Sequence, residues 1–294
     1  MQAMAGAEFG GAEAFFVRLV RALHRAGLEQ RVLIRENKAR ANSLRDAGIE
    51  PLELPFGGML DRRTPRAFKH EIKTFQPQIV MTWMNRASKM CPKGDFVQVG
   101  RLGGYYDLKY YRTCDHLIGN TEDIVSHIVG QGWDKSRAHY LPNFVSEDQA
   151  GDGPLRESLE KQAEDLGIKP RVRFLGWRED TAELFAACDL FVCPSRHEPL
   201  GNVVLEAWAQ GVPVIAADSM GPGTLIDHMD SGILVPVDDS DALARAVRAV
   251  IDDYELADHI ARRGREVYED RFTEGQVVQR YLDFFQSIVT NREN

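Results

Sequence analysis

Two glutamates, Glu198 and Glu206, stand in the stretch 193–216 with seven residues between them. Glu206 shares one helical face with Asn202 and Gln210, because residues four apart lie above one another on a helix, while apolar residues cover the other faces. A buried polar stripe needs hydrogen-bond partners, and a ligand rich in hydroxyl groups would supply them. An exposed stripe, with Glu198 as a charge at the helix end, explains the same spacing equally well.

The residues around the two glutamates predict a strand–helix–strand unit. Short apolar runs at 190–193 and 212–216 are typical of buried strands, and the residues between them predict a helix over about 200–210 that stops at Gly211. The polar loop with Glu198 therefore falls where the first strand ends and the helix begins. Parallel sheets bind ligands at that edge, and helix N-termini there attract anions.

The wider stretch resembles a known signature. Pro194 and Ser195 before Glu198, and the run EAWAQGVPV at 206–214, resemble the E-x7-E motif of retaining glycosyltransferases of family 4, which have the GT-B fold. The motif alone is weak, but its flanks make it specific. Further agreement follows in order along nearly the whole chain: GGAE at 10–13, LPN at 141–143, GDGPL at 151–155, VRFLG at 172–176, GPGT at 221–224 and DSGILV at 230–235.

The expected fold is α/β. Strands alternate with helices in both halves, which indicates parallel sheets. Among these elements we predict a strand at 172–175 and a helix to Val129 that Thr121 caps. The resemblance implies two Rossmann-like doubly wound domains facing each other across a cleft. We expect an acceptor-side domain over 1–145, joined by the C-terminal helix at about 275–294, and a donor-binding domain over 146–274.

The resemblance also implies the reaction. A hexosyltransferase of this kind moves a sugar from a nucleotide sugar, such as a UDP-sugar or GDP-sugar, to an acceptor hydroxyl with retained anomeric configuration, without a metal or other cofactor. We expect a glycan or glycolipid acceptor in lipopolysaccharide, glycolipid or other cell-surface glycan synthesis. Glu198 would contact the donor sugar near the reacting carbon, and Glu206 the ribose hydroxyls. The other expected donor-binding residues are Leu200, Gly201, Asn202, Gly223, Thr224, Gly10 and Gly11.

The residues expected on the acceptor side all lie in the first half of the chain. Glu13 follows the glycine loop 6–11, which is either a phosphate-facing loop or a tight strand–helix turn. Asn85 and Arg86 stand in a basic loop, 84–93, after the strand 79–83, where many members carry a histidine. Tyr105 and Asp107 belong to a tyrosine-rich stretch that suits either sugar stacking or ordinary packing.

One part of the expected donor domain is missing from the sequence. The chain passes from Val145 to Gly151 where family members have a strand, a loop with Arg and Lys, a helix and another strand. Some tens of residues near 146–150 are thus expected to be absent, and the phosphate-neutralising Arg and Lys have no assignment. The alternatives are a non-catalytic nucleotide-sugar or glycolipid binder and a GT-B sugar-nucleotide epimerase.

Composition adds a charge asymmetry. Of the 294 residues, the first 145 carry a balance of +6 and the remainder −14, within a net charge of −8. The basic half suggests an anionic partner, and because no nucleic-acid motif accompanies it, we expect an anionic membrane surface or phosphorylated glycolipid. Five cations crowd 62–73, as a solvated face or as a membrane contact: Arg62, Arg63, Arg66, Lys69 and Lys73.

The remaining features predict a cytoplasmic protein, with peripheral contact at the inner face of the cytoplasmic membrane. No apolar run is long enough for a membrane span, and the four scattered cysteines suggest reduced thiols. Asp239 and Asp241 form a D-x-D sequence, the metal–nucleotide motif of another glycosyltransferase fold. At a helix start after a strand, it predicts a helix cap rather than a metal site.

Overall fold

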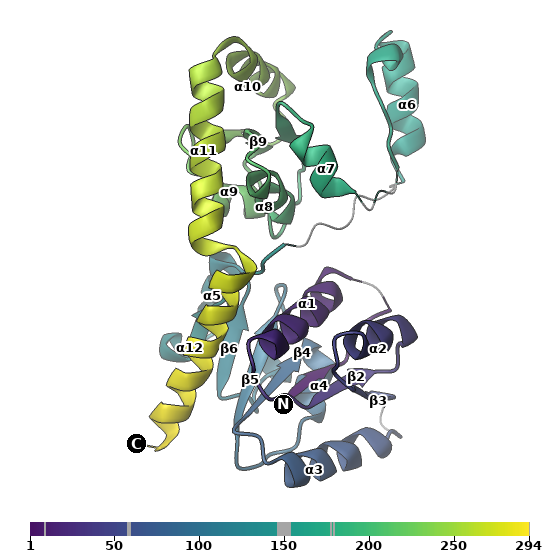
Figure 1. Cartoon of the computed structure of the whole chain (residues 1–294), viewed down its shortest axis with the longest axis vertical. Helices are drawn as coiled ribbons and strands as arrows, with labels where there is room; N and C mark the ends of the chain where they lie inside the picture. Colours follow the sequence, from purple (N-terminus) through teal and green to yellow (C-terminus); the bar gives the residue numbers. More distant parts are fainter. Residues whose placement is uncertain (9, 58–59, 146–153, 177, 179, 294) are drawn as a thin grey trace. The chain divides into compact units, whose positions relative to one another are not determined.

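The computed structural model describes the chain except residues 9, 58–59, 146–153, 177, 179 and 294 (Figure 1). The chain divides into two units. The first combines Met1–Phe144 with Arg271–Asn294, and the second is Val145–Asp270.

The first unit is built on a sheet of seven strands, all paired in parallel, in the order β3-β2-β1-β4-β5-β6-β7. Its strands are β1 Gln2–Met4, β2 Val32–Arg35, β3 Leu52–Leu54, β4 Ile79–Trp83, β5 Val97–Leu102, β6 His116–Gly119 and β7 Ala138–Tyr140. Its helices are α1 Gly11–Arg25, α2 Lys38–Arg45, α3 Arg63–Phe75, α4 Met84–Met90, α5 Glu122–Gly130 and α12 Glu274–Glu293, with short 3-10 turns at Leu108–Tyr110 and Lys135–Arg137.

Helices cover both faces of this sheet, because side chains along a strand alternate between its faces. Met4 and Ile34 point to the face that α1, α2 and α12 cover. Ala3 and Leu33, one residue earlier on the same strands, point to the face under α3 and α4. This two-sided burial explains the continuous apolar runs of the sequence.

The last helix, α12, is fixed to the first unit by a buried arginine. Arg101 on β5 is 2% exposed. Its Nε donates to the Tyr281 hydroxyl at 2.8 Å, and its Nη2 donates to Asn143 Oδ1 at 2.6 Å. The guanidinium also lies 4.6 Å from the ring centre of Phe15 and 4.5 Å from that of Trp83, so aromatic faces and hydrogen bonds replace its water.

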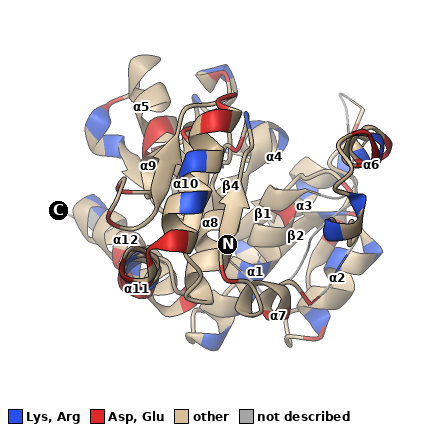
Figure 2. Ribbon diagram, turned by 90° about the horizontal axis from the view of Figure 1, so that it is seen from above, with Lys and Arg blue, Asp and Glu red and all other residues tan. Residues whose placement is uncertain are grey.

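The second unit has a smaller sheet in the part of the chain that the structure describes. Three parallel strands pair in the order β10-β9-β8: β8 Phe191–Cys193, β9 Val214–Ala217 and β10 Ile233–Val235. Its helices are α6 Arg156–Asp165, α7 Thr181–Ala186, α8 Asn202–Ala209, α9 Met220–Leu225, α10 Ser240–Asp252 and α11 Tyr254–Arg271, with a 3-10 turn at Lys169–Arg171. Charges of both signs lie on the outer helices, as Figure 2 shows for α6 and α10.

Two sequence predictions about elements were wrong. The stretch 172–175 is not a strand, because among the described residues no neighbouring strand pairs with it, and Leu175 is 54% exposed. The loop predicted to begin at Met84 is instead the helix α4, entered directly from β4. The segment expected to be absent near 146–150 lies outside the described residues.

Other predicted elements were confirmed to within a few residues. The helix after the two-glutamate loop is α8, and Thr121 caps α5 by accepting a hydrogen bond from the Ile124 amide at 3.1 Å. None of the described helices is long and apolar enough to cross a membrane.

Candidate functional site

The loops after β8 and β9 meet at the carboxyl edge of the second unit's sheet. The amide of Gly221 donates to the backbone carbonyl of Glu198 at 2.7 Å. Gly221 is the second residue of α9, which follows β9, whereas Glu198 lies in the loop between β8 and α8. This hydrogen bond therefore connects the loop after β8 with the segment after β9, at the sheet edge where parallel sheets bind ligands.

Glycine is required on both sides of this junction. Gly201 has φ +69°, and a Cβ there would lie 2.6 Å from Leu225 Cδ1. A Cβ on Gly221 would lie 2.6 Å from the Glu198 carbonyl oxygen and 2.7 Å from the Leu200 carbonyl carbon. The backbones around Gly201 and Gly221 therefore approach so closely that a side chain at either position would not fit.

The Glu198 side chain is half-buried and directed at the start of α8. Its Oε1 accepts a hydrogen bond from the Gly201 amide at 3.0 Å. Asn202 and Glu206 follow on α8, both partly exposed. The structure therefore places Glu198, Leu200, Gly201 and Asn202 together at the sheet edge, with Glu206 about one turn further along the helix.

The α9 side of the edge contributes the other predicted donor-binding residues. Gly223 and Thr224 are exposed in the first turns of α9, and the Thr224 hydroxyl donates to the Gly221 carbonyl at 2.8 Å. Ser219, which sequence reasoning missed, is 6% exposed, and its hydroxyl has no hydrogen-bond partner among the described residues. Its position two residues after β9, directly before α9, is the signal that could have identified it.

A third loop, after β10, reaches the same edge. Arg196, two residues before Glu198, forms an ion pair with Asp238. Asp239 accepts a hydrogen bond from the Ala242 amide at 2.8 Å and so caps α10, as the sequence predicted for this D-x-D segment. Among the described residues, no group of three or more His, Cys, Asp or Glu side chains could hold a metal ion.

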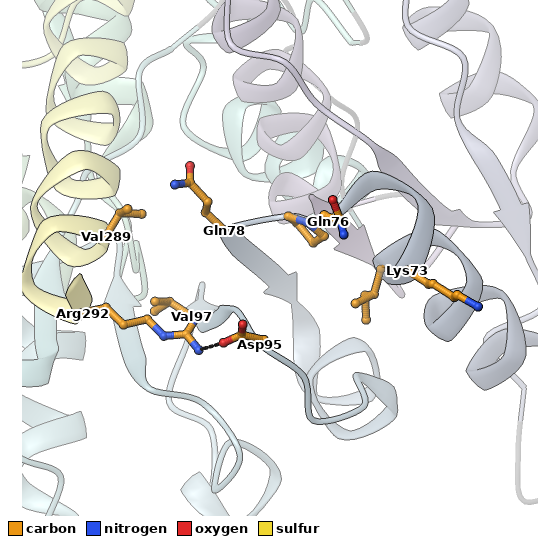
Figure 3. A pocket seen from close by; sticks show the side chains of 9 residues that line it. Lys73, Gln76, Gln78, Asp95, Val97, Val289 and Arg292 are labelled. Carbon is orange, nitrogen blue, oxygen red and sulfur yellow. Dashed lines mark hydrogen bonds and ion pairs between the residues drawn. The ribbon is translucent and has the colours of Figure 1, made fainter.

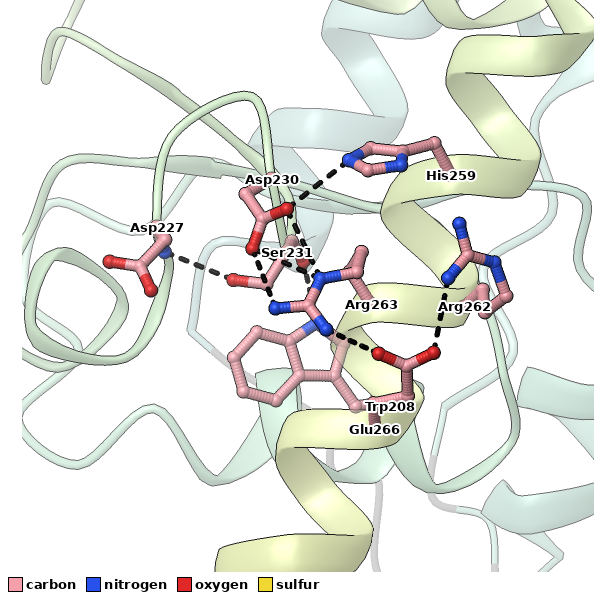
Figure 4. A network of polar contacts seen from close by, with 8 residues as sticks. All are labelled: Trp208, Asp227, Asp230, Ser231, His259, Arg262, Arg263 and Glu266. Carbon is pink, nitrogen blue, oxygen red and sulfur yellow. Dashed lines mark hydrogen bonds and ion pairs between the residues drawn. The ribbon is translucent and has the colours of Figure 1, made fainter.

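A polar network connects α11 to the loop before β10, and Trp208 of α8 bonds to the same loop (Figure 4). The guanidinium of Arg263 pairs with the Asp230 carboxylate at 3.2 Å and also with Glu266, while His259 Nε2 lies 3.2 Å from Asp230. The hydrogen bond from Arg263 lowers the pKa of Asp230 below its usual value. The buried Trp208 indole of α8 donates to the Ser231 carbonyl at 3.0 Å.

The glycine loop of the first unit is closed around Glu13. This side chain is 5% exposed, and its Oε1 accepts a hydrogen bond from the Ala7 amide at 2.6 Å. A Cβ on Gly6 or Gly10 would collide with the same carboxylate. The Glu13 carboxylate thus fills the space inside the loop, while Gly10 and Gly11 remain exposed at the start of α1.

A hollow lies at the carboxyl edge of the first unit's sheet, and two of the predicted acceptor-side residues, Asn85 and Arg86, line it. Asn85 Oδ1 accepts a hydrogen bond from the buried Tyr111 hydroxyl at 2.7 Å. Tyr105 and Asp107 are not part of its lining: Tyr105 bonds to Asp123, and Asp107 pairs with Lys109 at 2.7 Å. Tyr106 and Tyr110 line the hollow instead, because neighbouring residues of this stretch point in different directions.

A different hollow lies at the amino ends of β4 and β5, beside the end of α3 (Figure 3). Lys73, Gln78 and Val289 line it, and the ion pair between Arg292 and Asp95, at 2.5 Å, crosses it. Ligands of open parallel sheets bind at the opposite, carboxyl edge. We therefore assign no ligand to this hollow.

Comparison with protein families identifies the class of protein. The sequence model described as "Glycosyl transferases group 1" matches residues 92–267. The lipopolysaccharide core biosynthesis glycosyltransferase LpsE of Rhizobium meliloti (strain 1021) is 34% identical, over 95% of this chain and 96% of that protein. LpsD of the same strain is 31% identical, over 96% and 97% of the two chains. The alignment with LpsE runs over 330 residues, more than the 294 of this chain, so the relative carries residues that have no counterpart here.

Solved structures show the same fold. HepE of Anabaena in complex with UDP superposes with a TM-score of 0.84 at 18% identity, covering 97% of this chain and 99% of that chain. The HepE complex with UDP-glucose gives 0.77 at 18% identity, over 98% and 100%. The apo form of the lipopolysaccharide outer core galactosyltransferase WaaB gives 0.75 at 18% identity, over 98% and 99%. The fold of this chain is thus the α/β GT-B fold, as the sequence predicted.

Proposed function

This chain belongs to the group 1 glycosyl transferases, and we propose that it moves a sugar from a nucleotide-sugar donor to an acceptor hydroxyl with retained anomeric configuration. The observation that carries the proposal is the edge of the second unit, where Glu198, the Gly201–Gly221 contact and the start of α8 come together. The E-x7-E spacing of Glu198 and Glu206 makes retaining family 4 the expected subgroup.

The main physical demand of this reaction is the charge of the departing nucleoside diphosphate. Transferases stabilise such a charge with fixed hydrogen-bond donors aimed at it. The start of α8 supplies backbone amides that the helix itself leaves unbonded, together with the positive end of the helix dipole. We propose that these groups hold the donor phosphates without a divalent metal.

The two glutamates then have different tasks. Glu198 lies in the loop beyond the end of β8, and we assign it to the donor sugar near the reacting carbon. Glu206 lies a turn into α8, and we assign it to the ribose hydroxyls, which donate well to a carboxylate. Asn202 begins α8, and Gly223 and Thr224 lie in α9 at the same sheet edge. We assign these three residues to the remaining donor contacts.

The biological setting comes from the relatives. LpsE and LpsD are named for lipopolysaccharide core biosynthesis, and both align along almost the whole of this chain. HepE is a UDP-binding and UDP-glucose-binding protein of the same fold. We propose that this chain uses a UDP-sugar or GDP-sugar and extends a lipopolysaccharide or related glycolipid, with the first unit on the acceptor side.

Two observations favour a second candidate, a nucleotide-sugar or glycolipid binder without turnover. The described sheet of the second unit has three strands, and the Arg and Lys that the resemblance implies for the diphosphate have no assignment in this sequence. An epimerase of the same fold would also bind a nucleotide sugar, but would change the donor in the absence of an acceptor.

A panel of UDP-sugars and GDP-sugars tests the proposal. Thermal unfolding with each compound identifies the donor, because a ligand that binds only the folded state raises the midpoint. The bound donor is then incubated with lipopolysaccharide core acceptors. Transfer supports the enzyme, binding without transfer or epimerisation supports the binder, and no protection by any compound would overturn both.

A further inference from the structure

The hollow at the carboxyl edge of the first unit is strongly basic. Its volume is about 830 Å³, and its lining includes Arg35, Arg86 and Lys89, with Asp61 as the acidic residue. The three cations come from different places in the fold. Arg35 ends β2, while Arg86 and Lys89 stand on successive turns of α4.

Asp61 offsets only one of the three positive charges, and hydrogen bonds from neutral donors occupy its carboxylate. Asp61 accepts from the Gly57 amide at 2.8 Å, from the Thr64 hydroxyl at 2.6 Å, and from two amides at the start of α3 at 3.0 Å. Burial acts to raise the pKa of Asp61, but these hydrogen bonds outweigh it and lower the pKa. Within the described residues, neither Arg35 nor Lys89 has an ion-pair partner.

The other carboxylate nearby, Glu13, has a buried cation of its own. Glu13 is buried behind the glycine loop and contributes to raising the pKa of Tyr106, after burial itself. The buried Arg40 lies close enough to interact with Glu13, and its Nη2 donates to the Ala7 carbonyl at 2.7 Å. The excess positive charge of the hollow is therefore left for a ligand.

The walls of the hollow are held in shape. Arg86 Nη1 donates to the Phe56 carbonyl at 2.8 Å, which fixes this guanidinium across the rim. Phe56 and Met84 have φ values of +41° and +70°, a left-handed conformation that costs energy for side chains of this size. Strained backbone of this kind concentrates at binding sites, where the surrounding structure enforces it.

Aromatic side chains complete the lining. Tyr106 and Tyr110 are partly exposed and border the hollow. Their rings can cover the apolar face of a sugar, and their hydroxyls can bond to its polar groups. Cations with tyrosines suit a sugar that carries an acidic group.

We propose that this hollow binds an anionic acceptor, a sugar bearing a carboxylate or a phosphate, and that Arg35 and Lys89 bind its anionic group. The inference rests on the proposed function for calling the ligand an acceptor. Charge-assisted hydrogen bonds to Arg and Lys are about twice as strong as neutral ones, so the site discriminates acidic from neutral sugars.

Three matched probes test the proposal: octyl glucoside, octyl glucuronide, and octyl glucoside phosphorylated on its primary hydroxyl, each below its micelle-forming concentration. Titration at low salt should show at least one acidic probe binding about tenfold more tightly than the neutral one, a difference of about 1.4 kcal/mol. Raised salt should reduce the difference. The acid that is preferred tells a carboxylate from a phosphate ligand.

The double variant Arg35→Gln/Lys89→Gln should lose most of this preference and keep its thermal midpoint, because both side chains are exposed. Lys135→Gln, an exposed lysine away from the hollow, is the matched control and should bind like the wild type. Equal binding of the three probes, or an unchanged preference in the double variant, would overturn the inference. Nucleotide-sugar protection measured on the same samples tests the proposed function separately, since the second unit is unaltered.

Discussion

The amide of Gly221 and the carbonyl of Glu198 share a hydrogen bond of 2.7 Å, so the turn after β9 holds the loop that carries the proposed catalytic carboxylate. The contact depends on glycine, because a Cβ on Gly221 would lie 2.6 Å from that same carbonyl oxygen. The position of Glu198 is therefore set by a residue more than twenty positions later in the sequence.

Gly221→Ala should weaken nucleotide-sugar binding and lower stability, since the two loops must separate to admit the methyl group. Overpacking of this kind costs about 1–3 kcal/mol. Denaturant unfolding and donor titration measure both effects. Gly275→Ala is the control, because a Cβ there meets nothing within 4 Å, and it should leave binding unchanged. Normal binding by Gly221→Ala would show that the loop contact does not organise the donor site.

Glu206→Ala should weaken binding of the nucleotide sugar and of the free nucleoside diphosphate alike, because both contain the ribose. Each hydrogen bond from a hydroxyl to a charged acceptor contributes about 1.5–3 kcal/mol. Titration calorimetry with the two ligands measures the loss. Unchanged affinity for both would remove Glu206 from the donor site, and a loss for the sugar nucleotide alone would move it to the sugar.

The first unit should lose stability as the pH falls from about 6.5 to about 4. His139 Nε2 lies 3.0 Å from His116 Nδ1, and burial, followed by the neighbouring His116, lowers the pKa of His139 from 6.5 to about 4. Within this window the unfolded chain binds a proton that the folded chain does not, so protonation favours unfolding; below about pH 4 both states are protonated and the effect levels off.

Unfolding curves across that window test the histidine pair. His139→Leu should flatten the pH dependence, whereas His70→Leu, which replaces an exposed histidine on α3, should leave it unchanged. Arg137 and Asp115 also act on His116, and both remain in the two variants. An equally steep loss of stability in His139→Leu would place the acid sensitivity elsewhere.

The basic helix α3 should bind anionic membranes. Five cations on this helix and at its N-cap are exposed: Arg62, Arg63, Arg66, Lys69 and Lys73. Each cation near an anionic leaflet contributes on the order of 1 kcal/mol. Wild-type protein should co-sediment with anionic but not neutral vesicles and should be released by salt. Replacing all five with Gln should abolish binding. Equal behaviour of the two proteins would leave these side chains as ordinary solvated surface.

Sequence reasoning predicted the elements that local pattern determines. The α8 helix, the Thr121 and Asp239 caps and the parallel α/β architecture follow from periodicity and capping residues within a few positions. The failed strand at 172–175 shows the limit of that approach, because an apolar run becomes a strand only where a neighbour can pair with it.

Contacts between distant residues were beyond that reasoning. The Gly221–Glu198 bond, the buried Ser219 hydroxyl and the basic hollow each depend on which loops meet at a sheet edge. Residue spacing also does not predict which tyrosines of 105–110 face the hollow, because side-chain directions do not repeat regularly in this irregular segment. Tyr106 and Tyr110 line it, while Tyr105 lies beside His127.

The most direct test of the central claim is the product formed by wild-type protein and by Glu198→Gln from the donor that the nucleotide-sugar panel identifies. We expect wild-type protein to form a glycoside whose anomeric configuration, read from the proton coupling in NMR, equals that of the donor. Glu198→Gln should bind the donor as tightly as the wild type but turn over far more slowly. The expected loss of turnover is well beyond threefold, since a threefold change alone corresponds to less than about 1 kcal/mol of barrier. An inverted product, or a Glu198→Gln variant that retains turnover to within about threefold, would contradict the assignment of Glu198 to the reacting centre of a retaining glycosyltransferase.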